Sequence, residues 1–256
     1  FERAVETHKA WREQLHRHLA ATLGLLVLVL CLLEARRRKH HVWVPVLCAS
    51  FATAAIPIYM QGYPVWAMAL SAVSIIGLIG FAIGVGREPF IRYTAILLAV
   101  VIVQAMLGMW TVTWLLKPIV VMAHLLGGLT TFSLLTWLSW RATPNNELIN
   151  AEAHLLKKLL WLGLALLSVQ IALGGWTSAN YAALACGNDF PKCLGSWMPA
   201  HDFQEAFVLW RGIGVDYEGG VLDGPARVAI QLAHRGMAIV VAAYLLGIAV
   251  KLIRTP

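Results

Sequence analysis

Long apolar segments, separated by short polar connections, make up most of the chain. Each has about 18 residues or more, enough for a helix to cross a hydrocarbon layer of about 30 Å. Pro57 and Pro64 leave one alternative open, in which the second and third segments form a single broken helix. The pattern predicts an all-α polytopic membrane protein. The seven predicted membrane-spanning helices are Ala10–Leu33, Val42–Tyr59, Val65–Val85, Ile91–Leu116, Ile119–Trp140, Leu155–Trp176 and Ala226–Leu252.

Composition agrees with this class. Of the 256 residues, 59% are hydrophobic and only 13% are charged, whereas about 25% of residues are charged in typical soluble domains. The chain begins with Phe1 rather than Met, and it ends at Pro256 directly after an apolar segment. We therefore expect it to be part of a longer polypeptide.

Charged residues are distributed unevenly between the two ends of the segments. If the amino end of the first segment lies outside, the inner side carries a net charge of +7 and the outer side a net charge of zero. This split follows the positive-inside rule, with Arg36–Lys39 as the densest inner cluster. The sequence shows no aromatic and basic pattern typical of a nucleic-acid groove. The excess basic charge therefore indicates topology and lipid contact, and no nucleic-acid partner is expected.

Two short patterns occur twice, both at the same end of apolar segments. One reads Gln, two residues, Leu, Gly, any residue, Trp, Thr, and occupies Gln104–Thr111 and Gln170–Thr177. The other begins with His and Arg, at His16–Ala20 and again at His234–Ala238. Repeated helical units in a membrane protein predict two halves built alike. A histidine kept within such a repeat suggests a paired site.

Three of the nine histidines, His16, His124 and His234, lie inside apolar segments at a common depth. Each is one to two turns from the outer end, about 9 to 12 Å along the helix axis. Ionisable groups inside a bilayer are costly and usually functional. A single histidine of this kind is equally well explained by a hydrogen bond between helices. Three at one depth favour a ligand site.

Heme fits this arrangement better than other metal groups do. Heme iron takes axial imidazole and its flat ring needs an apolar slot, whereas hard cations prefer oxygen ligands and catalytic zinc usually has further protein ligands. Arg17 and Arg235 follow two of the histidines at the wet end, where heme propionates need cationic partners. Glycine pairs beside the histidines would let a ring or a helix approach closely, although ordinary helix packing explains them equally well. These are Gly127, Gly128, Gly174 and Gly175.

Two cysteines, Cys186 and Cys193, lie close together in the long polar stretch before the last segment. If this stretch faces an oxidising compartment, a disulfide would stabilise the loop by about 2 to 3 kcal/mol. A zinc site is the weaker alternative, because no histidine or second cysteine pair has the usual ligand spacing. Cys31 and Cys48 lie at or within apolar segments, where packing explains them.

Four stretches of the sequence together resemble the heme A synthase family of the proteobacterial type, membrane enzymes that make heme A for terminal oxidases. They are WREQLHRHLAATLGLL, LGMWTVTWLLKPIVVMAHLLGGL, QIALGGWTSANYAALAC with DFPKC, and DYEGGVLDGPARVAIQLAHRGMA. The resemblance covers most of the chain except Val42–Pro89. It implies two four-helix bundles related by a pseudo-twofold axis along the membrane normal, each of which offers a pair of histidines to a heme.

The resemblance also implies a division of the chain. Residues 1–141 would form the N-terminal half, with an inserted helical pair at residues 42–86, and residues 154–256 would form part of the C-terminal half. Three spans of the family have no counterpart in this sequence. One precedes the first motif, and the other two, which include the second histidine of the C-terminal half, follow the last motif.

The activity that the resemblance implies is oxidation of the methyl group of heme O to a formyl group, which gives heme A. His16 and His124 match the histidines of the substrate site, and Arg17 belongs to the same motif as His16. Glu13 matches the catalytic carboxylate, which would accept a proton or stabilise positive charge at the oxidised carbon. A structural alternative is a helix-end acid favoured by the helix dipole or paired with Arg17 or Arg12.

In the second half, the resemblance assigns His234, followed by Arg235, to a site that holds heme b as a cofactor. Cys186 and Cys193 match a cysteine pair of the family. The expected partners are heme O, membrane lipid and, among proteins, heme O synthase, oxidase assembly factors or a second copy of the chain. The expected location is the bacterial inner membrane, with the heme-site histidines near its outer face.

Two other classes of protein remain as alternatives. A two-heme membrane electron-transfer protein of the cytochrome b type would use the same histidines and arginines, but it has no need of Glu13. A transporter or an assembly scaffold would explain the helices and repeats, but not the shared depth of the three histidines. Identification of the hemes bound to the complete protein would distinguish these classes.

Overall fold

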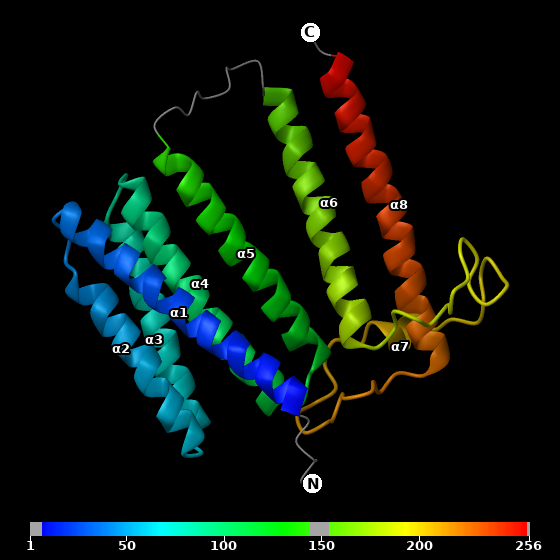
Figure 1. The fold of residues 1–256 in the computed structure, drawn as a ribbon, viewed down its shortest axis with the longest axis horizontal. Helices are drawn as coiled ribbons and strands as arrows, with labels where there is room; N and C mark the ends of the chain where they lie inside the picture. The colour runs from blue at the N-terminus through cyan, green and yellow to red at the C-terminus, as the bar shows by residue number, and fades with distance from the viewer. Residues whose placement is uncertain (1–6, 144–153, 255–256) are drawn as a thin grey trace. The chain divides into compact units, whose positions relative to one another are not determined.

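The computed structural model describes residues 7–143 and 154–254. It consists of helices joined by turns and one long loop (Figure 1). All but the short α7 are long and apolar enough to cross a membrane. The structure therefore confirms the predicted all-α polytopic membrane protein with seven spans. The helices are α1 (Thr7–Arg37), α2 (Trp43–Met60), α3 (Pro64–Gly84), α4 (Pro89–Thr113), α5 (Pro118–Ala142), α6 (His154–Ala179), α7 (Phe203–Ala206) and α8 (Gly224–Arg254).

Proline determines where several of the long helices begin. Pro64, Pro89 and Pro118 are the first residues of α3, α4 and α5. Proline suits this position because its missing N–H would have no partner within the helix and its φ angle is already helical. The turn at residues 61–63 separates α2 from α3, so these are two helices rather than one broken helix. Pro57 lies inside α2, close to its C-terminal end.

The chain divides into two compact units. The described part of the first unit is residues 7–105 and 131–143, and that of the second is residues 106–130 and 154–254. The second unit thus contains the end of α4, the beginning of α5, and all of α6, α7 and α8. The predicted division into halves near residues 141–154 stays a prediction, and the connection at residues 144–153 lies outside the described residues.

The core of the first unit joins side chains from α1, α3 and α4, of which Val27 and Leu78 are at most 1% exposed. α2 packs closely against α3. A Cβ atom at Gly77 would lie only 2.8 Å from Sγ of Cys48. In addition, the Ser74 hydroxyl donates a hydrogen bond of 2.7 Å to the Cys48 carbonyl oxygen. The bare glycine therefore allows the close approach of these two helices.

In the second unit α6 packs against α8 along much of its length (Figure 1). Near the N-terminal end of α6, the Tyr244 hydroxyl donates a hydrogen bond of 2.9 Å to the Leu159 carbonyl oxygen. Near its C-terminal end, Trp176 is 4% exposed and donates from Nε1 to the Ala206 carbonyl oxygen at 3.0 Å. These contacts fix α6 relative to α8 and α7, and so position the residues between them.

Residues 180–223, which we call the long loop, connect α6 to α8 and include α7. A disulfide joins Cys186 to Cys193 within it. Asp202 accepts a hydrogen bond of 2.9 Å from the Glu205 N–H and so caps α7. Asp223 accepts one of 2.9 Å from the Ala226 N–H at the start of α8. These caps satisfy backbone donors that a helix start leaves unpaired.

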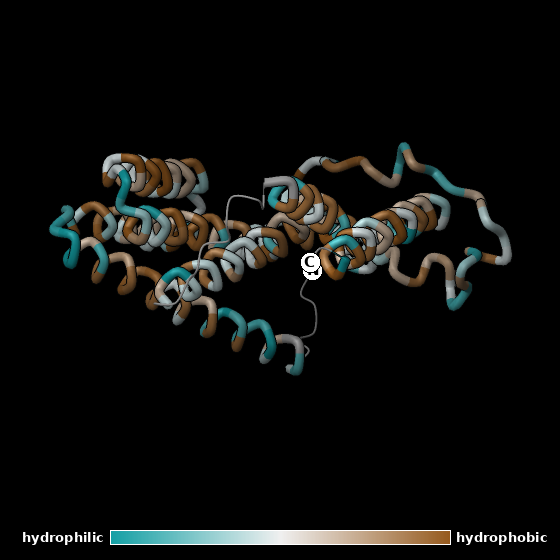
Figure 2. The backbone as a smooth tube through the Cα atoms, turned by 90° about the horizontal axis from the view of Figure 1, so that it is seen from above, coloured by the Kyte–Doolittle hydropathy of each residue, from teal (hydrophilic) through white to brown (hydrophobic). Residues whose placement is uncertain are grey.

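Much of the apolar surface of the spans is exposed. Ile83 in α3 and Ile239 in α8 are 68% and 69% exposed. Hydrophobic residues dominate the middle of the long helices, and hydrophilic residues gather at their ends and in the long loop (Figure 2). Such surfaces are unfavourable in water, whereas the lipid chains of a bilayer cover them at little cost. The chain is a multi-pass membrane protein.

Candidate heme-binding site

The two copies of the Gln, Leu, Gly, Trp, Thr repeat lie in α4 and α6, and in both the first glycine faces a histidine of a later helix. A Cβ atom built at Gly108 would lie 3.2 Å from Cε1 of His124, which is on α5. A Cβ atom at Gly174 would lie 3.3 Å from Cε1 of His234, which is on α8. Both imidazoles therefore lie against the bare backbone face of a glycine, in space that any other side chain would fill.

The glycines that the sequence analysis selected have different roles. Gly174 contacts His234, but a Cβ atom at Gly175 would lie 3.0 Å from Cδ2 of Leu125, so Gly175 serves helix packing. Around a Cβ atom at Gly128 no described atom lies within 4 Å. The glycine beside His124 is instead Gly108. The signal that could have found Gly108 is its place in the repeat, which is equivalent to that of Gly174.

The His234 ring is half-buried and contacts α6 at a second point. Nε2 of Gln170 lies 3.1 Å from Nδ1 of the ring and 3.4 Å from the His234 carbonyl oxygen. Gln170 precedes Gly174 by four residues, so both face His234 from the same side of α6. The Gln170 amide thus occupies Nδ1, and Nε2 is the ring nitrogen left for a metal when the imidazole proton lies on Nδ1.

Arg235 ties the segment closed by the disulfide to the helix turn that carries His234. Its Nη1 donates a hydrogen bond of 3.0 Å to the Lys192 carbonyl oxygen. Its guanidinium carbon lies 5.7 Å from the centre of the Phe190 ring. The segment from Cys186 to Cys193 is thereby held near the site. The predicted contact of Arg235 with a heme propionate stays a prediction.

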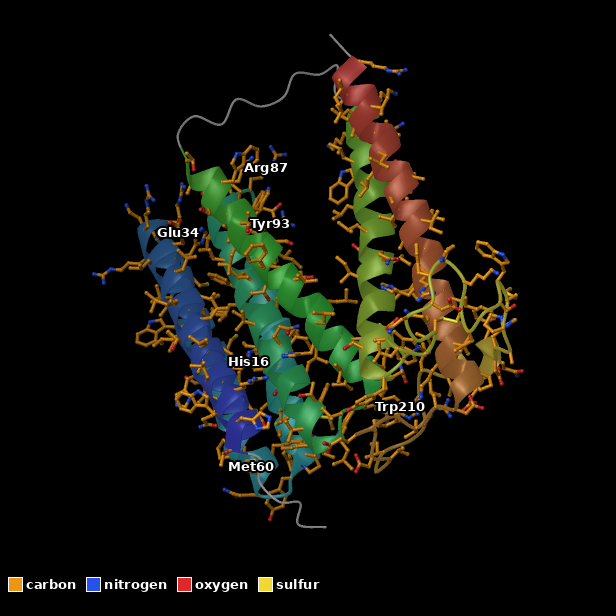
Figure 3. All side chains as sticks on the ribbon, turned by 45° about the vertical axis from the view of Figure 1, so that its right-hand side comes forward. His16, Glu34, Met60, Arg87, Tyr93 and Trp210 are labelled. Carbon is orange, nitrogen blue, oxygen red and sulfur yellow. A yellow bond between two sulfur atoms is a disulfide. The ribbon has the colours of Figure 1, made fainter. Side chains whose placement is uncertain are left out.

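Glu13 lies three residues before His16 and four before Arg17 on α1 in the first unit, so each of the two lies near Glu13 on the helix surface. Figure 3 shows His16 toward one end of this helix and Glu34 toward the other. Glu13 and Arg17 form an ion pair, and their side chains are 50% and 57% exposed. Because α1 begins at Thr7, Glu13 lies beyond the first turn, where the helix dipole has little effect. Of the structural alternatives for Glu13, the ion pair with Arg17 is therefore the one observed.

His16 and His124 belong to different units of the structure. Their predicted pairing at a substrate heme stays a prediction. Among the described residues, no group of three or more His, Cys, Asp or Glu side chains is arranged to hold a metal ion.

A buried lysine near this end of the helices was missed by the sequence analysis. Lys117 is 1% exposed and precedes α5. Its Nζ lies 3.5 Å from the centre of the Trp210 ring and donates a hydrogen bond to the Gly212 carbonyl oxygen. Burial lowers the pKa of Lys117 from its ordinary value of 10.5. The lysine thereby anchors the long loop, near the position of Trp210 in Figure 3, to the connection between α4 and α5.

Comparison with known proteins identifies the family. Residues 62–256 match the family of cytochrome oxidase assembly proteins, COX15-CtaA. The chain belongs to this family. It is also 35% identical, over 249 residues, to a protein named heme A synthase from Shewanella oneidensis. This alignment covers 97% of the chain and 60% of the length of the Shewanella protein. No solved structure matches the chain significantly.

The match to the cytochrome oxidase assembly family includes all described residues of the second unit. Both glycine–histidine contacts are therefore within the matched range. Glu13, His16 and Arg17 precede that range. The range also includes α3, which the sequence analysis assigned to an inserted helical pair at residues 42–86. The insertion stays a prediction.

Proposed function

We propose that the chain is part of a heme A synthase, which oxidises the methyl group of heme O to a formyl group for terminal oxidases. The observation that carries this proposal is the repeated contact of Gly108 with His124 and of Gly174 with His234. Two equivalent histidine positions suit a protein that handles two hemes. The conversion exchanges two methyl hydrogens for one oxygen atom. It is a four-electron oxidation and requires an electron acceptor.

We assign His234 as the residue that would hold a heme b cofactor. When bound, heme b would supply one-electron redox chemistry. His234 would bind it through Nε2, because Gln170 engages Nδ1 and Gly174 clears the adjacent edge of the ring. Arg235 uses one guanidinium N–H for the Lys192 carbonyl oxygen. The guanidinium has four further N–H donors, so Arg235 can also bind a propionate.

Heme O is the substrate that we assign to His16 and His124, with Arg17 as a partner of its propionates. Glu13 lies three residues before His16 and four before Arg17, so its carboxylate is near both side chains on the helix surface. The ion pair with Arg17 holds the Glu13 carboxylate at this position. In the reaction Glu13 would accept a proton or stabilise positive charge at the oxidised carbon.

The proposed location is the bacterial inner membrane, with the long loop and the heme-site histidines toward the outer face. The net charge of +7 on the opposite side supports this orientation. The disulfide supports it as well, because disulfides persist in oxidising compartments. Membrane-impermeant thiol reagents should label Cys186 and Cys193 in intact cells after reduction. Labelling that requires membrane rupture would reverse the orientation.

The proposed partners follow from the same activity. Heme O synthase would supply the substrate, and oxidase assembly factors would receive the product. A second copy of the chain is a further candidate partner.

The decisive experiment is extraction and chromatography of the hemes that copurify with the complete protein. Heme O or heme A together with heme b would support the synthase. Heme b alone would favour an electron-transfer protein of the cytochrome b type. A preparation without heme would exclude both activities. A variant with His201→Ala, in the exposed part of the long loop, is a suitable control because it alters a histidine that takes no part in the proposed sites.

A further inference from the structure

The repeat that places Gly174 against His234 places Gln170 there as well. We propose that Gln170 is a positioning residue, which fixes the tautomer and the ring orientation of His234 for iron binding. This inference rests on the proposed role of His234 as a heme ligand. It goes further because it explains why a glutamine, in particular, stands four residues before the glycine.

α6 holds one edge of the His234 ring at two points. Nε2 of Gln170 lies 3.1 Å from Nδ1. A Cβ atom at Gly174 would lie 3.3 Å from Cε1, the ring atom next to Nδ1. A side chain larger than hydrogen at Gly174 would push the ring away, and loss of the amide would release it. The two residues together therefore determine the direction in which Nε2 points.

Oε1 of the Gln170 amide indicates which tautomer of His234 the contact favours. Oε1 of Gln170 is buried and has no hydrogen-bond partner among the described residues. Rotation of the amide by half a turn exchanges Oε1 and Nε2 with little change of shape. It gives up the longer contact of 3.4 Å between Nε2 and the His234 carbonyl oxygen. Oε1 then accepts a hydrogen bond from Nδ1–H of His234, and the lone pair remains on Nε2, where iron binds. In the opposite arrangement the amide donates to Nδ1, so the imidazole proton lies on Nε2 and blocks iron binding.

An acceptor at Nδ1–H also changes the strength of the ligand. Hydrogen bonding of this kind raises the basicity of an imidazole that binds a metal. A more basic imidazole stabilises ferric iron more than ferrous iron. Gln170 should therefore lower the reduction potential of the heme at His234, in addition to fixing the ring.

The test compares Gln170→Met and Gln170→Glu in the complete heme-loaded protein. Gln170→Met keeps the length of the side chain but removes the acceptor. It should raise the reduction potential, and heme retention should fall about tenfold, as for other partners of metal-bound histidines. Gln170→Glu keeps an acceptor oxygen in either protonation state, so its potential should equal the wild-type value or lie below it. Ser168→Ala on α6 is the matched control, because that hydroxyl donates only to the Leu164 carbonyl oxygen of its own helix.

The readouts are the midpoint potential in a spectroelectrochemical titration and the electron paramagnetic resonance spectrum of the ferric heme. The inference is supported if the midpoint potential of Gln170→Met lies above that of Gln170→Glu and the potential of Ser168→Ala equals the wild-type value. It is then supported even if the protein does not convert heme O, in which case only the proposed activity fails. Equal potentials in a wild-type protein and both Gln170 variants that retain heme would overturn the inference alone. A wild-type protein that binds no heme would overturn both proposals.

Discussion

The pair α4 and α5 and the pair α6 and α8 present the same glycine–histidine contact with very different connections. Residues 114–117 join α4 to α5, whereas the whole long loop, with α7 and a disulfide, lies between α6 and α8. The glycine Cβ position is nevertheless 3.2 Å from the imidazole in one pair and 3.3 Å in the other. The contact thus depends on where glycine and histidine lie along paired helices. It does not depend on the length of the connection between the two helices.

The two connections also contact one another. Leu115 and Leu116 have φ angles of 51° and 60°, a left-handed conformation that the tight turn between two long helices requires. The Tyr217 N–H in the long loop donates a hydrogen bond of 3.1 Å to the Leu115 carbonyl oxygen. Together with Lys117, this bond fastens the long connection to the short one at the same end of the helices.

The largest expected effects come from replacing His234 and His124, and they should differ in which heme is lost. His234→Ala removes the proposed iron ligand and should reduce heme b content by at least about 100-fold, since loss of a hydrogen-bond partner of a ligand already costs about 10- to 100-fold. His124→Ala should instead weaken binding of heme O. Heme extraction followed by chromatography measures both. Equal loss of both hemes in each variant would contradict the assignment of separate sites.

Glu13→Gln on α1 should separate catalysis from heme binding. The amide keeps the shape of the carboxylate but removes its charge, so heme content should persist while conversion of heme O falls about 10- to 100-fold. Arg17→Gln, which breaks the ion pair but keeps the carboxylate, is the companion variant. Full heme A production by Glu13→Gln, measured in the complete protein, would return Glu13 to a structural role on α1.

Loss of the disulfide should affect only the long connection. Serine at both Cys186 and Cys193 should destabilise the closed segment by about 2 to 3 kcal/mol, because the unfolded loop regains freedom. Proteolytic cleavage after Lys192 reports this change. Reduction of the wild-type protein should give the same increase in cleavage, and the double variant should not respond to reductant. Cleavage that is unchanged in the variant would show that Arg235 alone holds the segment.

Alanine at the two repeated glycines should have similar, smaller effects. Both Gly108→Ala and Gly174→Ala place a methyl group 3.2 to 3.3 Å from an imidazole carbon. The ring must move by a few tenths of an ångström, at a cost of about 1 to 3 kcal/mol. Thermal unfolding and the heme absorption spectrum measure the shift. Gly128→Ala and Gly236→Ala, where no described atom lies within 4 Å of a new Cβ, are the matched controls. A spectral change in only one pair would show that the two contacts are not equivalent.

The smallest expected effect is a pH dependence at Lys117. Burial lowers the pKa of Lys117 below 10.5, so the folded loop binds this proton less well than the unfolded loop does. The burial of charged Lys117 therefore destabilises the folded loop. This destabilisation is fully present below the pKa of Lys117 in the folded loop, and it decreases as the pH rises from that pKa toward 10.5. Protection of the loop against cleavage after Arg211 should therefore increase over this range. Lys117→Met should abolish this rise in protection with pH. If the variant keeps the wild-type pH profile, another titratable group causes the rise.

Much of the fold follows from the sequence alone. The approximate helix boundaries were predictable because prolines and charged residues flank the apolar segments, as where α3, α4 and α5 begin at Pro64, Pro89 and Pro118. The common depth of His16, His124 and His234 in the sequence also predicted the level of the candidate site. Gly108 was not selected as the partner of His124, because the residues next to a single glycine in a helix do not show what that glycine faces. Lys117 was missed for a related reason, since a lysine beside the end of a span usually lies in water.

The sequence by itself determined that seven apolar segments become helices, that the charge is asymmetric across them, and that two copies of one motif occur. These properties depend on neighbouring residues and on the medium, so they can be read along the chain. Only the tertiary structure decided which glycine faces which imidazole, that the Gln170 amide reaches Nδ1 of His234, and that Lys117 is buried against Trp210. These contacts join residues far apart in the chain, and they depend on the packing of one helix or loop against another.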